Sequence, residues 1–311
     1  MSDTLSVIVP CYNEQETIQP FIQAIEQIKP EVPELTVDIL FINDGSKDNT
    51  LAVLKETSND WIHYLSFSRN FGKEAALLAG LEHTTKSDYI VVMDVDLQDP
   101  PHLIPQMYRL IKEGAYDCVG TRRVTRKGEP PIRSFFARQF YKIINKISNV
   151  EFVDGVRDYR LMTRQMTDAI LELKEVNRFS KGIFSWVGFD TKYLEYENIE
   201  RTKGETSWSF WSLLNYSIEG IVSFSEAPLM LATYIGIISF VISIFALLFI
   251  VIRALLFGDP TAGWPSLVAI VLALGGLQLF CLGILGKYLG KTFLEVKKRP
   301  IYIVKEKDIE K

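Results

Sequence analysis

Two long stretches without a charged residue constrain this chain more than any other feature. Residues 227–252 and 260–286 are runs of 26 and 27 residues that contain no Asp, Glu, Lys or Arg. Roughly 20 apolar residues are enough to cross the hydrocarbon core of a bilayer. The density of Leu, Ile, Val and Phe over this length argues against the alternative of two buried helices in a soluble core. The sequence therefore predicts a hairpin of two transmembrane helices at residues 227–288.

The charges beside this hairpin predict its orientation. Five basic residues follow the second stretch, namely Lys287, Lys291, Lys297, Lys298 and Arg299, whereas the loop at 253–265 holds only Arg253 and Asp259. Cytoplasmic loops carry an excess of Lys and Arg. The N-terminus lacks the basic start of a signal peptide. We therefore expect a multi-pass protein of the cell membrane with two spans, in which residues 1–226 and a basic tail at 289–311 lie in the cytoplasm.

Residues 206–226, directly before the hairpin, are rich in aromatic side chains. The pattern predicts an amphipathic helix at the membrane interface with an aromatic belt, the alternative being that these rings belong to the soluble core. The rings are those of Trp208, Phe210, Trp211, Tyr216 and Phe224.

Short apolar runs alternate with helical patterns through the first 120 residues. The runs lie at 5–10, 37–43, 62–68, 88–94 and 117–121. Strands that are nearly all apolar and alternate with helices indicate a parallel sheet with helices on both faces, which is an α/β fold. Such sheets bind ligands at the carboxyl ends of their strands, and the polar clusters Asn13–Glu14, Asp44 and Asp94–Asp96 follow three of the runs. The three cysteines form no CxxC pair, so the sequence indicates neither a disulfide framework nor a zinc site.

The stretch "YIVVMDVDLQDPP" drives an apolar run into several carboxylates. Asp94 and Asp96 are spaced to converge on one divalent cation, and Gln98 could add a neutral oxygen. Oxygen ligands of this kind suit Mg²⁺ or Mn²⁺. The alternative is that Asp94 and Asp96 are merely solvated. For Asp99, which precedes Pro100, we expect a helix-capping role.

Several motifs together resemble a known family. "VIVPCYNE", "INDGSKDNT", "RNFGKEAALLAG" and "MDVDLQDPP" are similar in order and spacing to family 2 glycosyltransferases. "GTRR", "RDYRLM" and "KGETSWSFW" ahead of two spans resemble the polyprenyl-phosphate glycosyltransferases, a group that includes dolichyl-phosphate mannose synthase and the bactoprenol glucosyltransferases. The resemblance implies an A-type glycosyltransferase fold, Rossmann-like with a mostly parallel sheet, at residues 1–205. Arg157 and Thr163 depart from the pattern of many relatives, which carry Gly and an acidic residue there.

The resemblance also implies roles for individual residues. The uridine or guanosine end of the donor is expected at Pro10, Tyr12, Asn13, Glu14 and Asp44. The metal on the diphosphate is expected at Asp94, Asp96 and Gln98, with Lys73 either near the diphosphate or simply on the surface. Asp158 is expected to be the catalytic aspartate, either as a base or, because the acceptor is already an anion, as a positioner or charge stabiliser. Arg160 is expected to be its ion-pair partner or a phosphate ligand, and Asp96 is expected to be essential. Helix capping is the alternative role for Asp158.

A basic segment, residues 122–142, has seven Lys or Arg against the single Glu129. Because a phosphate monoester carries about −1.5 to −2 charge, we expect the acceptor phosphate to bind there and at one later arginine. The candidate ligands are Arg122, Arg133, Ser134 and Arg201. The other basic residues of the segment are interpreted as a surface attracted to anionic lipid. Nucleic acid is a poor partner because the patch is local and the chain has a net charge of −4.

The sequence thus predicts an inverting, metal-dependent hexosyltransferase that uses a nucleotide sugar and a polyprenyl phosphate. UDP-glucose and UDP-N-acetylglucosamine are the leading donors, ahead of GDP-mannose, and self-association into a homo-oligomer is expected. Two alternatives stay open, a glycosyltransferase for another membrane lipid and a non-catalytic membrane scaffold.

Overall fold

The α/β part of the chain is built on one mixed sheet of eight strands. The computed structural model describes residues 2–123, 139, 141–148, 150–196, 218–257 and 263–309. The strands are β1 (Asp3–Cys11), β2 (Leu35–Asn43), β3 (Ile62–Phe67), β4 (Tyr89–Val92), β5 (Cys118–Arg123), β6 (Val156–Thr163), β7 (Thr191–Tyr196) and β8 (Val304–Lys307). Their order across the sheet is β7-β5-β6-β4-β1-β2-β3-β8. The pairs β4–β6, β5–β6 and β3–β8 are antiparallel, and the other neighbours are parallel.

Helices cover both faces of this sheet, so that the central strands are buried on both sides. The helices are α1 (Ile18–Ile28), α2 (Thr50–Thr57), α3 (Lys73–His83), α4 (Ile104–Lys112), α6 (Arg164–Glu172) and α7 (Ser180–Trp186). Leu5, Val7 and Val9 of β1 pack into the core formed with α1 and α4, whereas Ile8 packs into the core formed with α3 and α6. This alternation explains why the strand runs are almost entirely apolar.

The strand order changes direction next to β1. From β1 the chain adds β2 and β3 on one side, then returns to place β4 on the other side. The carboxyl ends of β1 and β4 therefore flank a topological switch point, where open α/β sheets bind their ligands. Asn13 and Glu14 follow β1 at this point, and Asp94 follows β4. The predicted fold class, α/β with a mostly parallel sheet, is confirmed.

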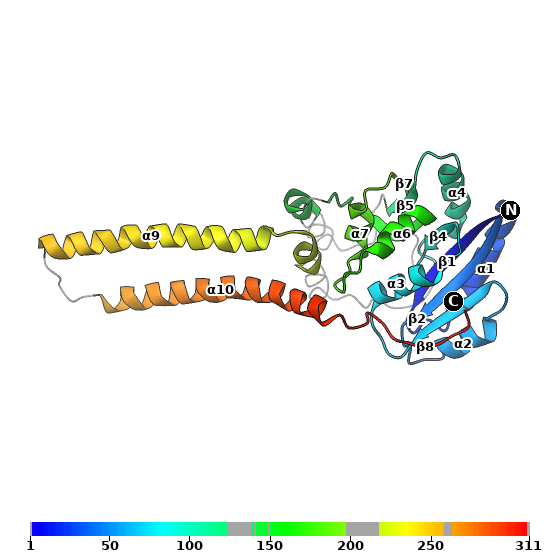
Figure 1. Cartoon of the computed structure of the whole chain (residues 1–311), viewed down its shortest axis with the longest axis horizontal. Helices are drawn as coiled ribbons and strands as arrows, with labels where there is room; N and C mark the ends of the chain where they lie inside the picture. Colours follow the sequence, from blue (N-terminus) through cyan, green and yellow to red (C-terminus); the bar gives the residue numbers. More distant parts are fainter. Residues whose placement is uncertain are drawn as a thin grey trace.

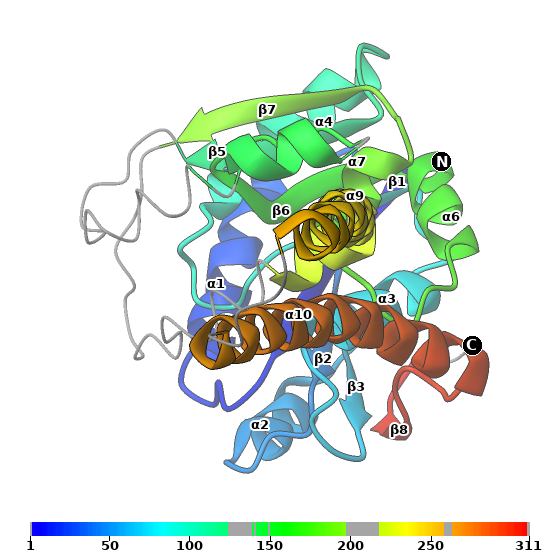
Figure 2. The same cartoon turned by 90° about the vertical axis from the view of Figure 1, so that its left-hand side faces the viewer.

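Two long helices extend from one end of the α/β domain (Figure 1). They are α9 (Ala227–Phe257) and α10 (Trp264–Lys297). Each contains a segment that is long and apolar enough to cross a membrane, and the residues of its most apolar part are not buried in the protein. Their bases are joined where the Tyr288 hydroxyl donates to the Ser225 carbonyl over 2.6 Å. Figure 2 looks along this pair toward the sheet. Helix α9 has 31 residues. At a rise of about 1.5 Å per residue its length is about 46 Å, more than the roughly 30 Å of a bilayer core.

Three details of the fold differ from the sequence prediction. The segment at 156–163, where helix capping was the alternative role for Asp158, is strand β6, and the next helix begins only at Arg164 with the Thr163 side chain as its cap. Asp158 therefore lies within a strand and caps no helix. The predicted tail at 289–311 contains the last turns of α10 and then β8, which pairs with the edge strand β3. Such pairing covers a sheet edge that would otherwise be open.

The aromatic residues before the hairpin lie only partly within the described chain. Phe224, expected in an interfacial belt, packs against Phe152 and Phe179 with ring centroids 5.9 and 6.0 Å away. Its assignment to the belt is wrong, because these rings form a small core of the domain. Trp208, Phe210, Trp211 and Tyr216 lie outside the described residues.

The first prediction concerns the close approach of α3 to β1. A Cβ added at Gly80 would lie 2.2 Å from Cγ2 of Ile8. Because overpacking a core costs roughly 1–3 kcal/mol, Gly80→Ala should lower the unfolding temperature of the detergent-solubilised protein, followed by tryptophan fluorescence. Gly276→Ala is the control, since its Cβ would meet no atom within 4 Å. Equal unfolding temperatures for Gly80→Ala and the unmodified protein would contradict this packing.

Candidate active site

The register of β4 and β6 places two aspartates opposite each other. Val92 of β4 pairs with Arg160 of β6 in antiparallel register. Continuing that register by two residues sets Asp94 opposite Asp158. Like charges directly opposite on neighbouring strands are destabilising, and a cation resolves the conflict here: Nζ of Lys73 lies 2.6 Å from Asp94 Oδ1 and 2.7 Å from Asp158 Oδ2. Lys73, which the sequence left between two interpretations, is thus the bridge between the two carboxylates.

The bridge determines the protonation of its members. Burial acts to raise the pKa of Asp158, but the charges of Lys73 and Lys181 and the hydrogen bond from Lys73 together lower it well below its usual range. Burial likewise acts to lower the pKa of Lys73, and the two aspartates raise it above its ordinary value. Both groups are therefore ionised at neutral pH. A carboxylate with a depressed pKa is a poor proton acceptor.

A second cation, Arg157, extends the cluster to Asp99. Its guanidinium Nη2 lies 3.8 Å from Asp94 Oδ2, and its Nε lies 3.1 Å from Asp99 Oδ1. The Tyr196 hydroxyl donates to the same Asp99 oxygen over 2.7 Å. Asp99 is buried, so the prediction that it caps a helix is wrong. Sequence analysis gave no role to Arg157 or Tyr196; for Arg157 the only signal was its departure from the Gly of many relatives.

The other residues after β4 form a tight turn. Leu97 has a φ of 55°, and the Gln98 amide donates to Asp96 Oδ1 over 3.1 Å. The side-chain oxygen of Gln98, expected on a metal, accepts from Arg123 over 2.9 Å. Within the described residues, no three Asp, Glu, His or Cys side chains gather as a metal site. Asp94 and Asp96 fit a cation such as Mg²⁺, which takes one or two protein carboxylates and completes its shell with substrate phosphates and water.

The polar residues after β1 and β2 hold each other in place. The Asn13 amide donates to Ser46 Oγ, and its side-chain oxygen accepts from the Lys47 amide, both over 2.9 Å. The Glu14 amide donates to Thr50 Oγ1, also over 2.9 Å. These bonds join the loops that follow β1 and β2 at the switch point. Tyr12 and Pro10 lie beside them, the former 41% exposed.

Asp44 fixes the turn that delivers Lys73. Its two carboxylate oxygens accept from the backbone amides of Phe71 and Gly72, over 2.6 and 2.9 Å. Gly72 has a φ of 95° and directly precedes α3. Burial raises the pKa of Asp44, against the effect of the two amide bonds.

The remaining candidates are placed as follows. Arg160 is buried, donates to the carbonyls of Asp158 and Arg157 over 3.3 and 3.0 Å, and lies over the Phe184 ring at 3.8 Å. It thus supports the backbone of β6, and the predicted side-chain ion pair with Asp158 is not formed between these two described residues. Arg122 donates from Nε to the Asp154 carbonyl over 3.0 Å. Arg133, Ser134 and Arg201 lie outside the described residues.

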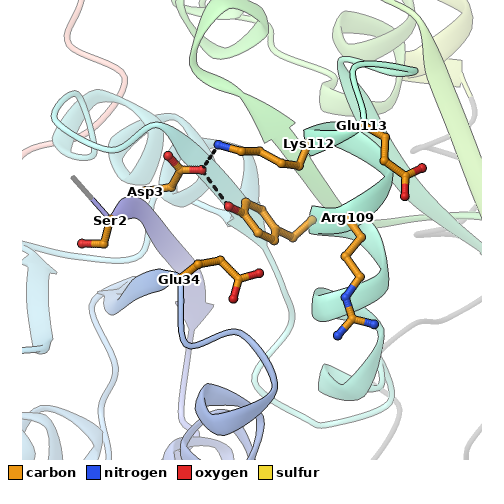
Figure 3. A pocket seen from close by; sticks show the side chains of 7 residues that line it. Ser2, Asp3, Glu34, Arg109, Lys112 and Glu113 are labelled. Atoms are coloured by element: carbon orange, nitrogen blue, oxygen red, sulfur yellow. Dashed lines mark hydrogen bonds and ion pairs between the residues drawn. The ribbon is translucent and has the colours of Figure 1, made fainter.

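A polar cavity of about 380 Å³ lies at the opposite end of the sheet (Figure 3). It opens beside Asp3, at the start of β1, whose carboxylate accepts from the Tyr108 hydroxyl and from Lys112. Because parallel sheets bind ligands at the carboxyl ends of their strands, this cavity is separate from the candidate site.

Open α/β sheets bind nucleotides at a topological switch point, and in this mostly parallel sheet the carboxylates of Asp94 and Asp158 lie there, bridged by Lys73. Residues 6–171, more than half of the chain, match the model of "Glycosyl transferase family 2". The chain belongs to this family and is a glycosyltransferase. It is 42% identical to "Bactoprenol glucosyl transferase" of Shigella phage SfX, over 97% of this chain and 99% of that protein. It is equally 42% identical to "Prophage bactoprenol glucosyl transferase homolog" of Escherichia coli strain K12, over 97% and 98%.

Solved structures with a similar fold are more distant in sequence. Glucosyl-3-phosphoglycerate synthase from Mycobacterium tuberculosis, in complex with Mn²⁺, UDP-glucose and phosphoglyceric acid, is 18% identical with a TM-score of 0.46. The match covers 71% of this chain and 78% of that one. Mannosyl-3-phosphoglycerate synthase from Rubrobacter xylanophilus is 17% identical with a TM-score of 0.48, over 70% and 71%.

The geometry of Asp44 predicts that its amide analogue will not replace it. In Asp44→Asn the side chain has one acceptor oxygen for the two backbone amides of Phe71 and Gly72. Its NH₂ group therefore faces the second of these amides. Leaving a buried donor unsatisfied costs about 1–3 kcal/mol, so the unfolding temperature should fall. Asp60→Asn, an exposed position in the turn before β3, is the matched control. An Asp44→Asn protein as stable as this control would show that the turn does not need both oxygens.

The Lys73 bridge predicts a pH-dependent loss of stability. In the unmodified protein the lowered pKa of Asp158 contributes stability above the ordinary carboxyl pKa, and this is lost as pH falls through the lowered value. In Lys73→Met, burial would raise the pKa of Asp158 and disfavour the folded state at neutral pH. Breaking a fully buried pair costs about 3–5 kcal/mol. The Lys73 side chain is 41% exposed, so we expect a smaller destabilisation at pH 7, roughly 1–3 kcal/mol.

The measurement is the unfolding temperature of both proteins as a function of pH. The two temperatures should converge between pH 7 and 4, because protonation of Asp158 in the variant removes the unpaired charge that destabilises it. A difference that stays constant over this range would contradict the ion bridge.

Proposed function

We propose that this protein transfers a hexose from a nucleotide sugar to polyprenyl phosphate at the cytoplasmic face of a membrane. The observation that carries the proposal is the similarity to two bactoprenol glucosyl transferases, which extends over the catalytic domain and the apolar hairpin together. Their names give a glucosyl group as the sugar and bactoprenol, a polyprenyl carrier, as the acceptor. UDP-glucose is therefore the favoured donor, ahead of UDP-N-acetylglucosamine.

The proposed arrangement in the membrane follows from the hairpin. Helices α9 and α10 cross the bilayer, the catalytic domain at 1–205 lies in the cytoplasm, and residues 206–226 connect the two at the interface. The basic residues near the end of α10 support this orientation. A polyprenyl phosphate in the cytoplasmic leaflet then presents its headgroup on the side of the catalytic domain. Self-association of the hairpins into a homo-oligomer belongs to the same proposal.

The donor is proposed to bind at the switch point of the sheet. Its nucleoside lies against Pro10, Tyr12, Asn13, Glu14 and Asp44, and its diphosphate lies near Lys73. Asp94, Asp96 and Gln98 would hold Mg²⁺ or Mn²⁺. When bound, the cation neutralises charge on the diphosphate leaving group, which needs no proton. The residues of the cluster thus bind and orient the donor phosphates.

The proposed transfer step is a direct displacement. An oxygen of the acceptor phosphate bonds to the anomeric carbon on the face opposite the nucleotide, and the bond from that carbon to the diphosphate breaks with inversion. The phosphate is already an anion, so no hydroxyl has to be deprotonated. The lowered pKa of Asp158 agrees with this chemistry, since a group that holds its proton so weakly serves poorly as a base. Asp158 instead positions Lys73 and stabilises positive charge that develops on the sugar.

The acceptor phosphate is proposed to bind near Arg122, at the end of β5. The Arg122 side chain is 42% exposed, so its guanidinium is accessible to an anion. Its Nη1 lies 3.9 Å from Glu195 Oε1. Arg133, Ser134 and Arg201 are the further ligands proposed from the sequence. Guanidinium groups suit this task because they bind phosphate oxygens in bidentate geometry. A neutral lipid hydroxyl, the alternative acceptor, would gain little from such a set.

The cation and the donor can be tested together. Asp96→Ala removes one anionic ligand, so we expect a loss of transfer of at least about a hundredfold, with the unfolding temperature within a few degrees of the unmodified protein. Asp60→Ala is the control. EDTA should abolish activity of the unmodified enzyme, and Mg²⁺ or Mn²⁺ should restore it. Full transfer in chelator would overturn the metal proposal and leave the rest of the site assignment standing.

The substrates are tested by purified protein with radiolabelled nucleotide sugars. We expect label from UDP-glucose to enter the organic phase only when undecaprenyl phosphate is present. Label transferred to diacylglycerol or ceramide would favour the alternative lipid acceptor. No incorporation from any nucleotide sugar, together with retained nucleotide binding in calorimetry, would favour a non-catalytic scaffold.

A further inference from the structure

Helix α10 carries one acidic residue near its cytoplasmic end, and that residue contacts the catalytic domain. Between Trp264 and Lys297 the only carboxylate is that of Glu295, among several lysines. Glu295 lies two helical turns beyond Lys287, the first charge after the apolar stretch. At the rise of an α-helix this separation is about 12 Å along the axis. Glu295 is therefore past the apolar stretch, on a helix that continues without interruption from that stretch.

The Glu295 carboxylate holds the loop between α6 and α7. It accepts from the backbone amide of Val176 over 3.0 Å, and from the backbone and side-chain amides of Asn177, each over 3.0 Å. A carboxylate that accepts several N–H bonds forms the stronger, charge-assisted kind of hydrogen bond. The loop is thus fixed to the membrane helix by a polar clamp.

Three residues later the same loop is held from the other side. The backbone amide of Ser180 donates to Glu74 Oε2 over 2.9 Å, and the Ser180 hydroxyl donates to the same oxygen. Glu74 is the neighbour of Lys73 in the first turn of α3. Residues 176–180 therefore connect the end of α10 to the turn that carries the bridge between Asp94 and Asp158.

The middle of this segment is held by apolar packing, because Phe179 packs against Phe152 and Phe224. A cavity of about 480 Å³ lies beside residues 176–180, and its lining includes Glu74, Val176, Asn177 and Arg299. Close packing usually fixes the relative positions of parts of a protein interior. Because a cavity lies beside the contacts of residues 176–180 with Glu295 and Glu74, these contacts depend on their hydrogen bonds. The two carboxylates therefore link the ends of the segment at 176–180 to α10 and to α3.

We infer that Glu295 is a positioning residue that sets the height of the Lys73 end of the active site above the membrane, through residues 176–180 and Glu74. The inference rests on the proposed function, because the acceptor is held in the bilayer while the donor is bound by the soluble domain. The clamp keeps the distance between the two constant. An acceptor that diffuses freely in water does not need that constant distance, and its transfer is independent of the clamp.

The test compares two acceptors in the full-length protein reconstituted into vesicles. Glu295→Ala should lower kcat/KM for undecaprenyl phosphate in the bilayer by at least about tenfold, the loss expected for a charge-assisted bond. Transfer to a short, water-soluble prenyl phosphate and the KM for the donor should change less than about twofold. Glu295→Gln, which keeps one acceptor oxygen, should recover part of the loss. Glu306→Gln is the matched control, because its partner Lys55 lies on α2, away from this joint.

An equal loss with both acceptors would overturn the inference in favour of a general structural role, and so would no loss with either. Backbone hydrogen exchange provides a readout that does not need transfer. In Glu295→Ala, exchange should speed up at Val176 and Asn177, and also at Ser180 and in the first turn of α3. Faster exchange confined to the first two amides would overturn the connection to α3. Unmodified protein that transfers to neither acceptor would refute the proposed function, while the exchange result would still decide whether the connection exists.

Discussion

The ion bridge of Lys73 with Asp94 and Asp158 is the interaction on which the rest of the site depends. The register of β4 and β6, continued two residues past the end of β4, brings the two aspartates opposite each other. An uncompensated pair of like charges there would oppose the pairing of the two strands. The compensating ammonium comes from a different part of the fold, the first residue of α3. Its position is set in turn by Asp44, which holds Phe71 and Gly72, and by the close packing of α3 on β1. The close packing of Gly80 against Ile8 thus bears on the charge state of Asp158 on β6.

Much of the sheet was predictable because the signals are local. Runs such as 37–43 are apolar except for Asp38 and the final Asn43 and lead into turn residues, so their extent and their burial on both faces follow from the sequence. Strand β6 was not predictable in this way. "VRDYRLMT" mixes charged and apolar residues, and only its place between β4 and β5 makes it a strand. The same holds for β8, a short charged segment after α10 whose structure comes from pairing with the exposed edge of β3.

In the candidate site, too, the local features could be predicted from the sequence and the non-local contacts could not. That carboxylates gather at the carboxyl ends of strands follows from topology, and the sequence indicated it. Their partners are non-local: Lys73 and Asp158 are far apart in the chain, and no spacing rule joins them. Asp99 shows how a local rule can fail. An aspartate before two prolines suits a helix cap, but Arg157 and Tyr196 provide a buried site whose ion pair and hydrogen bond replace that role.

The charge balance of the cluster bears on how a donor could bind. Among the described residues around Lys73, five carboxylates and five cationic side chains have formal charges that cancel, while Glu14 and Asp44 after β1 and β2 add two negative charges. The two sets that cancel are Glu74, Asp94, Asp96, Asp99 and Asp158 against Lys73, Arg123, Arg157, Arg160 and Lys181. A nucleotide sugar would add the negative charges of its diphosphate to a partly buried site, where unpaired charge is costly. Most of these cations already contact protein oxygens, so they can neutralise this excess only by releasing Asp94 or its neighbours. A divalent cation that arrives with the diphosphate restores the balance without breaking the Lys73 bridge. This requirement, rather than the number of carboxylates at the end of β4, is the stronger physical reason to expect a metal-dependent enzyme.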